Sequence, residues 1–278
     1  SIRLFNTINK KNGIEFTELN ISKENMEKQI RKNTKAVFVE TPTNPMMHVV
    51  DIEKLAKICH SHEILLIVDN TFLTPYLQNP LDLGADVVVH SGTKYLGGHN
   101  DTLAGFLIVR NKELAEKLHI LKKTTGAALS PFDSWLILRG IQTLAVRMQA
   151  AEKNADEIVE WMRTQKSIKK IYYPGITSHP GHEIMKRQAK GFGAMISFEM
   201  ENREQAFKIL ERVKLIKFAE SLGGIQTLLT YPATQTHADV SKEIMEKNGI
   251  TDSLLRLSVG IENSKDLIAD LEQAIQTI

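Results

Sequence analysis

A lysine stands among hydroxyl groups and glycines directly after an apolar run of the chain. Lys94 is the fifth residue of the segment HSGTKYLGGH (90–99), which follows the run ADVVV (85–89). A lysine amine that is removed from water loses its proton easily and becomes a nucleophile toward carbonyl groups. The hydroxyls of Ser91 and Thr93, together with the nearby glycine backbone, suit a phosphate. Lys94 taken alone is more often a solvent-facing turn residue, so its neighbours decide the interpretation.

A carboxylate follows an earlier apolar run. Asp69 comes directly after ILLIV (64–68), a run with the pattern of a strand that is apolar on both faces. A carboxylate in that position needs a cationic partner to offset its desolvation, unless it caps the turn through Asn70 or Thr71. A protonated pyridine nitrogen would be such a partner. An aspartate that holds a pyridinium and a lysine that forms an imine are the pair that pyridoxal 5′-phosphate (PLP) requires.

Short β-branched runs and longer segments of helical period must position these groups. The first half of the chain has runs typical of strands and one segment typical of a helix, at 36–39, 64–68, 87–89 and 104–109 and at 52–62. This alternation predicts an α/β fold with a mostly parallel sheet, in which the run 104–109 pairs back against the others. Ligands of such folds bind outside the carboxyl ends of the strands. We therefore expect Asn44, Asp69 and Lys94 to share one site.

A long helical stretch begins near position 134 and runs toward position 163, with a possible interruption at Arg139 and Gly140. Its apolar residues are expected to be buried: Trp135, Leu136, Leu138, Ile141, Leu144, Val146, Met148 and Trp161. Further strands are predicted at 193–200 and 254–259 and helices at 204–213 and 264–275, with Ser264 as the N-cap of the last. We interpret residues 1–150 as a large cofactor-binding domain and residues 151–278 as a second, smaller α/β domain.

The composition excludes several classes of protein. The chain has 278 residues and a formal net charge of +2, and its 35 basic and 33 acidic side chains are spread along the sequence, unlike those of nucleic-acid-binding or membrane-binding proteins. Cys59 cannot form an internal disulfide, which favours the cytoplasm and a buried, neutral thiol. The histidines lack a zinc-binding spacing, so no metal is assigned. The expected partners are small molecules and other copies of the chain.

A series of segments in chain order resembles the Cys/Met-metabolism family of PLP-dependent enzymes. The segments are ETPTNP (40–45), VDNTF (68–72), LDLGAD (81–86), HSGTKYLGGH (90–99), FAESLGG (218–224), YPATQTH (231–237) and LRLSVGIE (255–262). The family includes cystathionine γ-synthase, the cystathionine lyases and the O-acylhomoserine sulfhydrylases. The resemblance implies PLP as the cofactor and the aspartate aminotransferase-like fold, called fold type I.

The resemblance also assigns roles around the cofactor. It implies that Lys94 forms the imine, Asp69 holds the ring nitrogen, Asn44 lies near the 3-oxygen, Ser91 and Thr93 contact the phosphate, and Thr71 belongs to the same site. Members of the family use amino acids as substrates, so small amino acids are the expected ligands.

The substrate is expected to contact Arg256, Ser221 and Glu220. A planar guanidinium suits two-point recognition of an α-carboxylate, and the resemblance places Ser221 beside the substrate and the lysine. In the family, the position of Glu220 is usually glutamate in enzymes that act at Cγ and aromatic in the well-known β-lyases, which tend to have tryptophan at the position of Leu222. The resemblance therefore implies γ-replacement on an O-acylhomoserine by cysteine or sulfide, the cystathionine γ-synthase reaction of methionine biosynthesis. A cystathionine γ-lyase or β-lyase is the alternative.

Family members carry further cofactor-binding elements before the position at which this sequence starts. These are a glycine-methionine phosphate turn, a tyrosine that stacks on the ring, and a tyrosine-x-arginine pair that reaches the phosphate of a neighbouring subunit. The sequence starts at Ser1 inside an amphipathic segment, which predicts that roughly a quarter of a complete fold is missing. A non-catalytic truncated homologue is therefore a second alternative. The resemblance also implies a homotetramer, assembled as a dimer of dimers.

Overall fold

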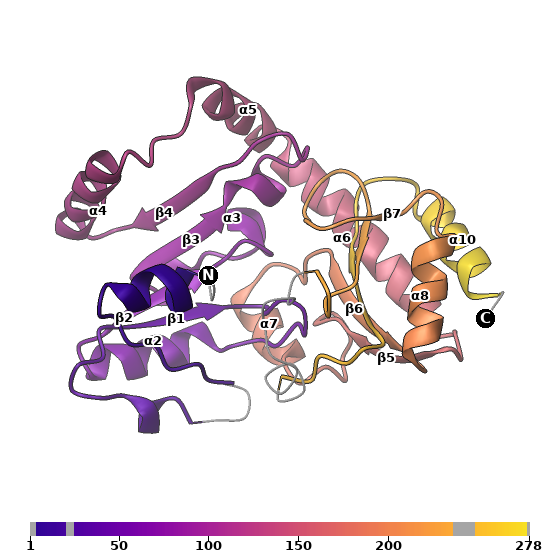
Figure 1. Ribbon diagram of the computed structural model, residues 1–278, viewed down its shortest axis with the longest axis horizontal. Helices are drawn as coiled ribbons and strands as arrows, with labels where there is room; N and C mark the ends of the chain where they lie inside the picture. Colours follow the sequence, from indigo (N-terminus) through magenta and orange to yellow (C-terminus); the bar gives the residue numbers. More distant parts are fainter. Residues whose placement is uncertain (1–3, 21–24, 236–247, 277–278) are drawn as a thin grey trace.

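The computed structural model describes residues 4–20, 25–235 and 248–276. Within these ranges the chain forms two β-sheets with helices packed against them (Figure 1). The strands of the first sheet end at Val109, and those of the second begin at Ile168. The predicted α/β class is therefore confirmed. The last two residues of the segment 231–237 lie outside the described residues.

The first sheet carries the candidate site. Its strands are β1 (Ala36–Glu40), β2 (Leu65–Asp69), β3 (Val87–Ser91) and β4 (Gly105–Val109). They lie in the order β1-β2-β3-β4, with β1, β2 and β3 parallel and β4 antiparallel to β3. The apolar runs predicted as strands are confirmed, as is the return of the fourth run against the others. Because three of the strands are parallel, their carboxyl ends meet at one edge of the sheet.

Helix α2 (Ile52–Ser61) joins β1 to β2 and packs against the first sheet. Its apolar residues recur at helical spacing, so Leu55 and Cys59 both face Leu66 and Val68 of the strand core. Burial raises the pKa of the Cys59 thiol to about 11, which keeps it neutral as the sequence predicts.

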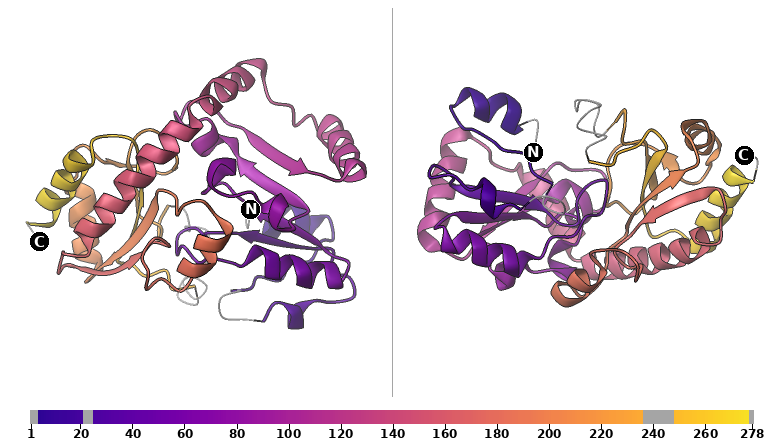
Figure 2. Two further views of the ribbon diagram at one scale, coloured as in Figure 1. Left: turned by 180° about the vertical axis from the view of Figure 1, so that it is seen from behind. Right: turned by 90° about the horizontal axis from the view of Figure 1, so that it is seen from below.

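Shorter segments and two helices complete this half of the structure. The short segments are η1 (Phe5–Asn9), η2 (Glu27–Gln29), α3 (Thr74–Leu77), η3 (Pro80–Leu83) and η4 (Gly92–Leu96). The helices after β4 are α4 (Lys112–Thr125) and α5 (Pro131–Ile141). In Figures 1 and 2, α4 lies beside β4 at the outer end of the first sheet, whereas α5 leads into the next helix of the chain and contacts η4.

The second sheet is mainly antiparallel. Its strands are β5 (Ile168–Tyr172), β6 (Met195–Met200), β7 (Lys217–Phe218), β8 (Leu228–Thr230) and β9 (Leu254–Ser258), in the order β5-β6-β9-β8-β7. The helices of this half are α6 (Leu144–Met162), α7 (His182–Gln188), α8 (Arg203–Arg212) and α10 (Ser264–Ile275). The strands and helices predicted between 193 and 275 are confirmed, except that Asn263 and not Ser264 is the N-cap of α10.

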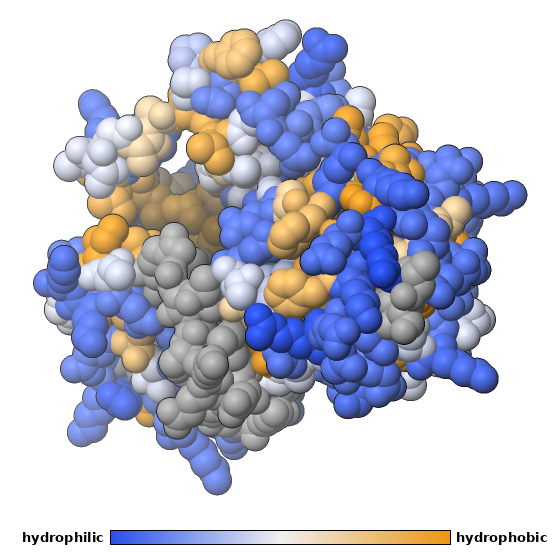
Figure 3. Space-filling model, turned by 45° about the vertical axis from the view of Figure 1, so that its right-hand side comes forward, coloured by the Kyte–Doolittle hydropathy of each residue, from blue (hydrophilic) through white to orange (hydrophobic). Residues whose placement is uncertain are grey.

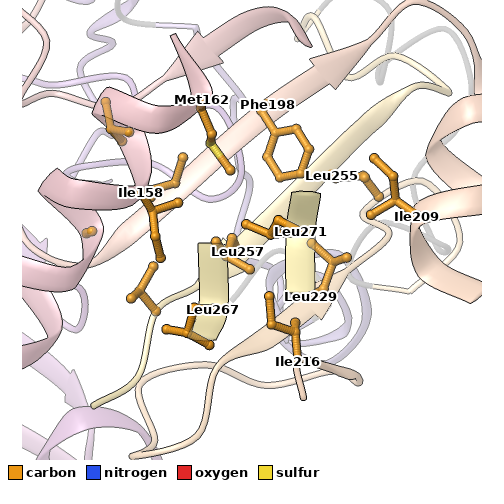
Figure 4. Close-up of a cluster of buried hydrophobic side chains, with 14 of the residues drawn as sticks. Ile158, Met162, Phe198, Ile209, Ile216, Leu229, Leu255, Leu257, Leu267 and Leu271 are labelled. Carbon is orange, nitrogen blue, oxygen red and sulfur yellow. The ribbon is translucent and has the colours of Figure 1, made fainter. Parts of the chain in front are cut away.

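A large apolar core fills the space between the second sheet and its helices. Phe198 of β6 and Leu257 of β9 pack with Ile158 of α6, Ile209 of α8 and Leu271 of α10 (Figure 4). Every residue of β6 and of β9 is buried, so both faces of these central strands are covered. This core holds β9 in place, and β9 supplies one residue of the site described below.

Helix α6 belongs to both halves of the molecule. Leu144 and Met148 pack with Phe72 and Leu73 of the first half, whereas Ile158 lies in the core of the second sheet. The helix crosses position 150 without interruption. The division of the chain into domains 1–150 and 151–278 therefore stays a proposal. Of the helices in the described ranges, none combines the length and the apolar composition needed to cross a membrane.

Several residues expected to be buried are exposed, so that part of the prediction is wrong. The exposed residues are Trp135, Leu138, Ile141 and Val146. The helical stretch is divided at Gln142 and Thr143, slightly after the expected interruption. One face of α5 is apolar and points away from the other described residues. An apolar stripe indicates only that one face of a helix tends to be buried, and it does not identify the surface that covers this face. Figure 3 shows apolar side chains of this kind on the surface beside charged ones.

Candidate active site

The carboxyl ends of β1, β2 and β3 bring polar side chains to one edge of the first sheet. Glu40, the last residue of β1, pairs in register with Asp69, the last residue of β2. Paired residues of neighbouring parallel strands point to the same face, so the two carboxyl groups lie on one side of the sheet. Ser91 ends β3, and Lys94 follows in η4.

Lys94 departs from the helical backbone of η4. Its φ of −92° and ψ of −132° interrupt the turn. The amine Nζ donates a hydrogen bond to Oγ of Ser221 at 3.0 Å. Ser221 has a φ of +88°, which residues with side chains rarely adopt and which is often retained at functional sites. The strained residue therefore carries the hydroxyl that meets the lysine amine.

The surroundings lower the pKa of the Lys94 amine. Desolvation by burial is the largest cause and the positive charge of Arg256 adds to it, while the carboxylate of Glu220 acts in the opposite direction. A lowered pKa increases the fraction of neutral amine, which is the form that attacks a carbonyl carbon.

Arg147 of α6 holds the turn that presents Lys94. Its guanidinium donates hydrogen bonds to the carbonyl oxygens of Tyr95 at 2.7 Å and of Gly140 at 2.8 Å. Gly98 has a φ of +76° and lies against this guanidinium, which leaves no space for a side chain. The sequence analysis did not identify Arg147, because an arginine inside a helical pattern is usually a surface residue.

Asp69 is tied to β3 through Thr71. Its Oδ1 accepts hydrogen bonds from the backbone N–H of Thr71 at 3.0 Å and from the hydroxyl of Thr71 at 2.6 Å. The oxygen of that hydroxyl accepts a hydrogen bond from the backbone N–H of Ser91 at 2.9 Å. The turn-capping alternative considered for Asp69 is thus present, but these bonds use only Oδ1. They orient the carboxylate and leave Oδ2 for a cationic partner.

Arg256 of β9 reaches the strand ends from the second sheet. The residue is 1% exposed. Nη1 donates to Oδ1 of Asn44 at 2.9 Å, and Nη2 donates to the carbonyl oxygen of Ser221 at 2.8 Å and to Oγ1 of Thr230 at 3.0 Å. Nε is buried and has no hydrogen-bond partner among the described residues. A buried cationic donor without a partner is costly, so an anionic ligand group beside it would be stabilised.

Hydrogen bonds and one strand pairing join these residues in a continuous path, which the chain itself closes between Ser91 and Lys94. The path, which we call the contact ring, passes through Lys94, Ser221, Arg256, Asn44, Glu40, Asp69, Thr71 and Ser91. It joins the first sheet to the second and includes most of the residues that the sequence predicts for cofactor and substrate.

Thr93 and Glu220 lie outside the contact ring. The Thr93 hydroxyl oxygen accepts a hydrogen bond from the backbone N–H of Ala104 at 3.1 Å and donates to the Ala104 carbonyl at 3.4 Å, so its contact with a phosphate stays a prediction. Glu220 is exposed and adjoins Ser221, and it acts on Lys94 and Arg256 through its charge. Within the described ranges, no group of three or more histidine, cysteine or acidic side chains could hold a metal ion.

Glu40 is a member of the contact ring to which the sequence analysis gave no role. Its Oε2 accepts a hydrogen bond from the backbone N–H of Asn44 at 3.1 Å. Desolvation, followed by the charge of Asp69, raises the pKa of Glu40 to about 7. Its place as an acidic residue at the end of a predicted strand, like that of Asp69, is the signal that could have identified it.

The residues present fit PLP. The lowered pKa of Lys94 favours the neutral amine that reacts with an aldehyde, and Oδ2 of Asp69 can accept a hydrogen bond from a protonated ring nitrogen. The buried Nε of Arg256 fits the carboxylate of an amino acid. The site therefore has groups for both the cofactor and a substrate that carries an α-carboxylate.

Known proteins with similar sequences include cystathionine lyases and a cystathionine synthase. Cystathionine gamma-lyase of Bacillus subtilis (strain 168) is 48% identical over 267 residues, which are 96% of this chain and 70% of that protein. Cystathionine beta-lyase of Lactococcus lactis subsp. cremoris (strain MG1363) is 46% identical over 277 residues, which are 99% of this chain and 73% of that protein. Cystathionine gamma-synthase/O-acetylhomoserine (thiol)-lyase of Bacillus subtilis is 48% identical over 274 residues, which are 98% of this chain and 69% of that protein.

A solved structure is similar along the whole chain. Cystathionine gamma-lyase from Lactobacillus plantarum, complexed with L-serine, has a TM-score of 0.96 and 43% identity, and the match covers 100% of this chain and 73% of that one. The model of the Cys/Met metabolism PLP-dependent enzyme family matches residues 1–276. The chain therefore belongs to the Cys/Met metabolism family of PLP-dependent enzymes.

Proposed function

We propose that this chain catalyses γ-replacement on an O-acylhomoserine, with cysteine or sulfide as the incoming thiol. The observation that carries the proposal is the position of Glu220, whose charge acts on both the amine of Lys94 and the guanidinium of Arg256. Reaction at Cγ requires removal of a proton from Cβ as well as from Cα, whereas a β-lyase needs only the latter. A carboxylate that favours the ammonium form of Lys94 helps this lysine to take up and return protons in succession.

Four residues of the site have a part in this reaction. Arg256 binds the α-carboxylate of the substrate, and the Lys94 amine takes the proton from Cα. Ser221 accepts a hydrogen bond from that amine and limits its movement. Asp69 holds the proton of the ring nitrogen. When bound, PLP supplies the electron sink for the negative charge that develops on the substrate carbon.

A cystathionine γ-lyase or β-lyase is the second candidate. It is supported by the relatives named as lyases, whose identity to this chain is close to that of the relative named as a synthase. The purified protein with PLP is supplied with an O-acylhomoserine and cysteine in one assay and with cystathionine alone in another. We expect the faster turnover in the first assay. Fast turnover of cystathionine alone, with little reaction in the first assay, would replace the synthase by a lyase.

Cofactor binding tests the alternative that the chain is a non-catalytic homologue. The active protein should be yellow, lose its visible band on borohydride reduction, and carry the reduced cofactor on Lys94 in a peptide map. Protein that stays colourless after PLP is added would support the non-catalytic alternative.

We further propose that the protein acts in the cytoplasm as a homotetramer. The resemblance to its family supports the assembly, and so do the exposed apolar residues of α5, such as Phe132, Trp135 and Leu138. The small number of cysteines supports the location.

A further inference from the structure

Glu40 is a member of the contact ring, yet the reaction described above gives it no part. We propose that Glu40, whose carboxyl group stands beside that of Asp69 on the neighbouring strand, positions Asn44 and supports Asp69 as the partner of the cofactor's ring nitrogen. Glu40 is thus a positioning residue that acts through its neighbours. This inference rests on the proposed function, because it needs Asp69 and Asn44 to be cofactor-binding residues.

The register of the sheet brings the two carboxyl groups together. Glu40 and Asp69 are Cα partners on the parallel strands β1 and β2, and both are the last residues of their strands. Their side chains therefore leave the sheet on the same face, separated by about the spacing of neighbouring strands, roughly 5 Å. Two carboxylates at such a distance repel each other, so the charge of Asp69 adds to burial in raising the pKa of Glu40.

A second contact links Glu40 to the residues expected at the cofactor and the substrate. Its Oε2 accepts the backbone N–H of Asn44, and Oδ1 of Asn44 accepts Nη1 of Arg256. Glu40 thus holds the backbone of Asn44, and Arg256 holds its side chain. Loss of the Glu40 oxygen would leave a backbone N–H without its acceptor and allow the segment between β1 and α2 to move.

The charges that face Glu40 come from two other elements. Asp69 of β2 raises its pKa and Arg256 of β9 lowers it, after desolvation as the largest cause. The guanidinium of Arg256 also interacts with the charge of Lys94, which lies in η4, and with the charge of Glu220, which lies in the segment after β7. A cationic ring nitrogen beside Asp69 would add a positive charge near the pair. Its arrival would favour release of the proton of Glu40 to solvent, so cofactor affinity should depend on pH through Glu40.

The test measures PLP binding to the whole chain by equilibrium dialysis at about pH 6 and about pH 8, on either side of the raised pKa. The variants are Glu40→Gln, which keeps an oxygen acceptor but no titrating proton, and Glu40→Ala, which lacks both. Glu199→Gln is the matched control, since Glu199 is a buried glutamate that binds the hydroxyl of Tyr172 in the second sheet. No amino-acid substrate is needed, so a failure of the proposed reaction does not affect this measurement.

We expect Glu40→Ala to weaken PLP binding about tenfold at the lower pH, because one buried hydrogen bond is lost, and by about fivefold more at the higher pH, where it also lacks the charge that the wild type gains. At the lower pH, the PLP affinity of Glu40→Gln should be within about threefold of that of the wild type. At the higher pH, its affinity relative to the wild type should fall by about fivefold more, because only the wild type gains the second negative charge. The PLP affinity of Glu199→Gln should match that of the wild type at both pH values. If Glu40→Ala fails to fold, the pH dependence of Glu40→Gln decides. Wild-type affinity in Glu40→Ala, or an equal ratio of Glu40→Gln to wild type at both pH values, would overturn the proposal.

Discussion

Burial moves the pKa values of Lys94, Arg256 and Glu40 away from their ordinary ranges, and the neighbouring charges then adjust each of them. The pKa of Arg256 falls to about 10, and the charge of Glu40 is the one that opposes this shift most strongly. Lys94 and Asp69 could be found from the sequence, because each is a polar residue directly after an apolar run. Glu40 has the same position, but its importance depends on its register with β2, which the sequence alone does not state.

The first prediction at this scale concerns the amine. Since Glu220 raises the pKa of Lys94 against the effect of burial, Glu220→Gln should lower that pKa further. The rate at which PLP attaches to the cofactor-free protein should then reach its plateau at a lower pH than in the wild type. Stopped-flow absorbance across a pH series measures this, with the exposed Glu201→Gln as control. A plateau that stays at the same pH would show that Glu220 does not act on the amine.

The second prediction concerns stability. Glu40 has an ordinary pKa of 4.5 and a pKa of about 7 in the folded chain, so the folded state binds this proton more tightly. The stabilisation is therefore fully present below pH 4.5 and is lost as the pH rises through 7. Urea unfolding of the cofactor-free protein should show that the wild type loses stability relative to Glu40→Gln over this interval. Parallel pH profiles for the two proteins would contradict it.

At the scale of elements, continuous apolar strands were the most predictable feature. The runs that became β1, β2, β3 and β9 could be recognised without their partners, because each is a short, mainly apolar run bounded by polar or turn-forming residues. Helix α4 escaped prediction because none of its residues is buried, which leaves a weak periodic signal. The contact of Arg256 with Asn44 spans 212 positions in the sequence, and no local pattern could disclose it.

The turn that presents Lys94 provides a test at this scale. Gly98→Ala introduces a side chain at a positive φ and against the guanidinium of Arg147. Gly126→Ala, at the end of α4, has the same kind of φ but nothing within 4 Å of the added carbon, so it serves as the control. The control variant should lose about 1 kcal/mol of unfolding free energy. Gly98→Ala should lose roughly 2 kcal/mol more than the control, together with much of its PLP affinity. Urea unfolding measures the stability and equilibrium dialysis the affinity; equal losses of stability in the two variants would exclude the packing argument.

At the scale of the whole molecule, the two sheets share one site and an apolar core between them. Helix α6 extends from this shared core, where Met148 packs with Phe72 and with Met195 of β6, into the core of the second sheet. Helix α5, which leads into α6 (Figure 1), has an exposed apolar face. That face is available for contact with another copy of the chain.

Assembly through α5 can be measured directly. Phe132 and Leu138 are 67% and 66% exposed, and replacing both by aspartate should shift the protein toward smaller species in sedimentation velocity. Leu215→Asp, which changes an exposed leucine in the second half, should leave the distribution unchanged. A wild type that sediments as a monomer at all concentrations would refute the proposed tetramer.

The contact ring has a consequence for how the protein is made. Arg256 lies on β9, the last strand within the described ranges, and it donates hydrogen bonds to the side chain of Asn44 and to the carbonyl oxygen of Ser221. A ribosome must therefore synthesise the chain through β9 before the ring can close. Capture of the vitamin-derived cofactor becomes a late event in maturation, and a nascent chain halted before β9 would emerge with the lysine in place and no finished site to hold what it binds.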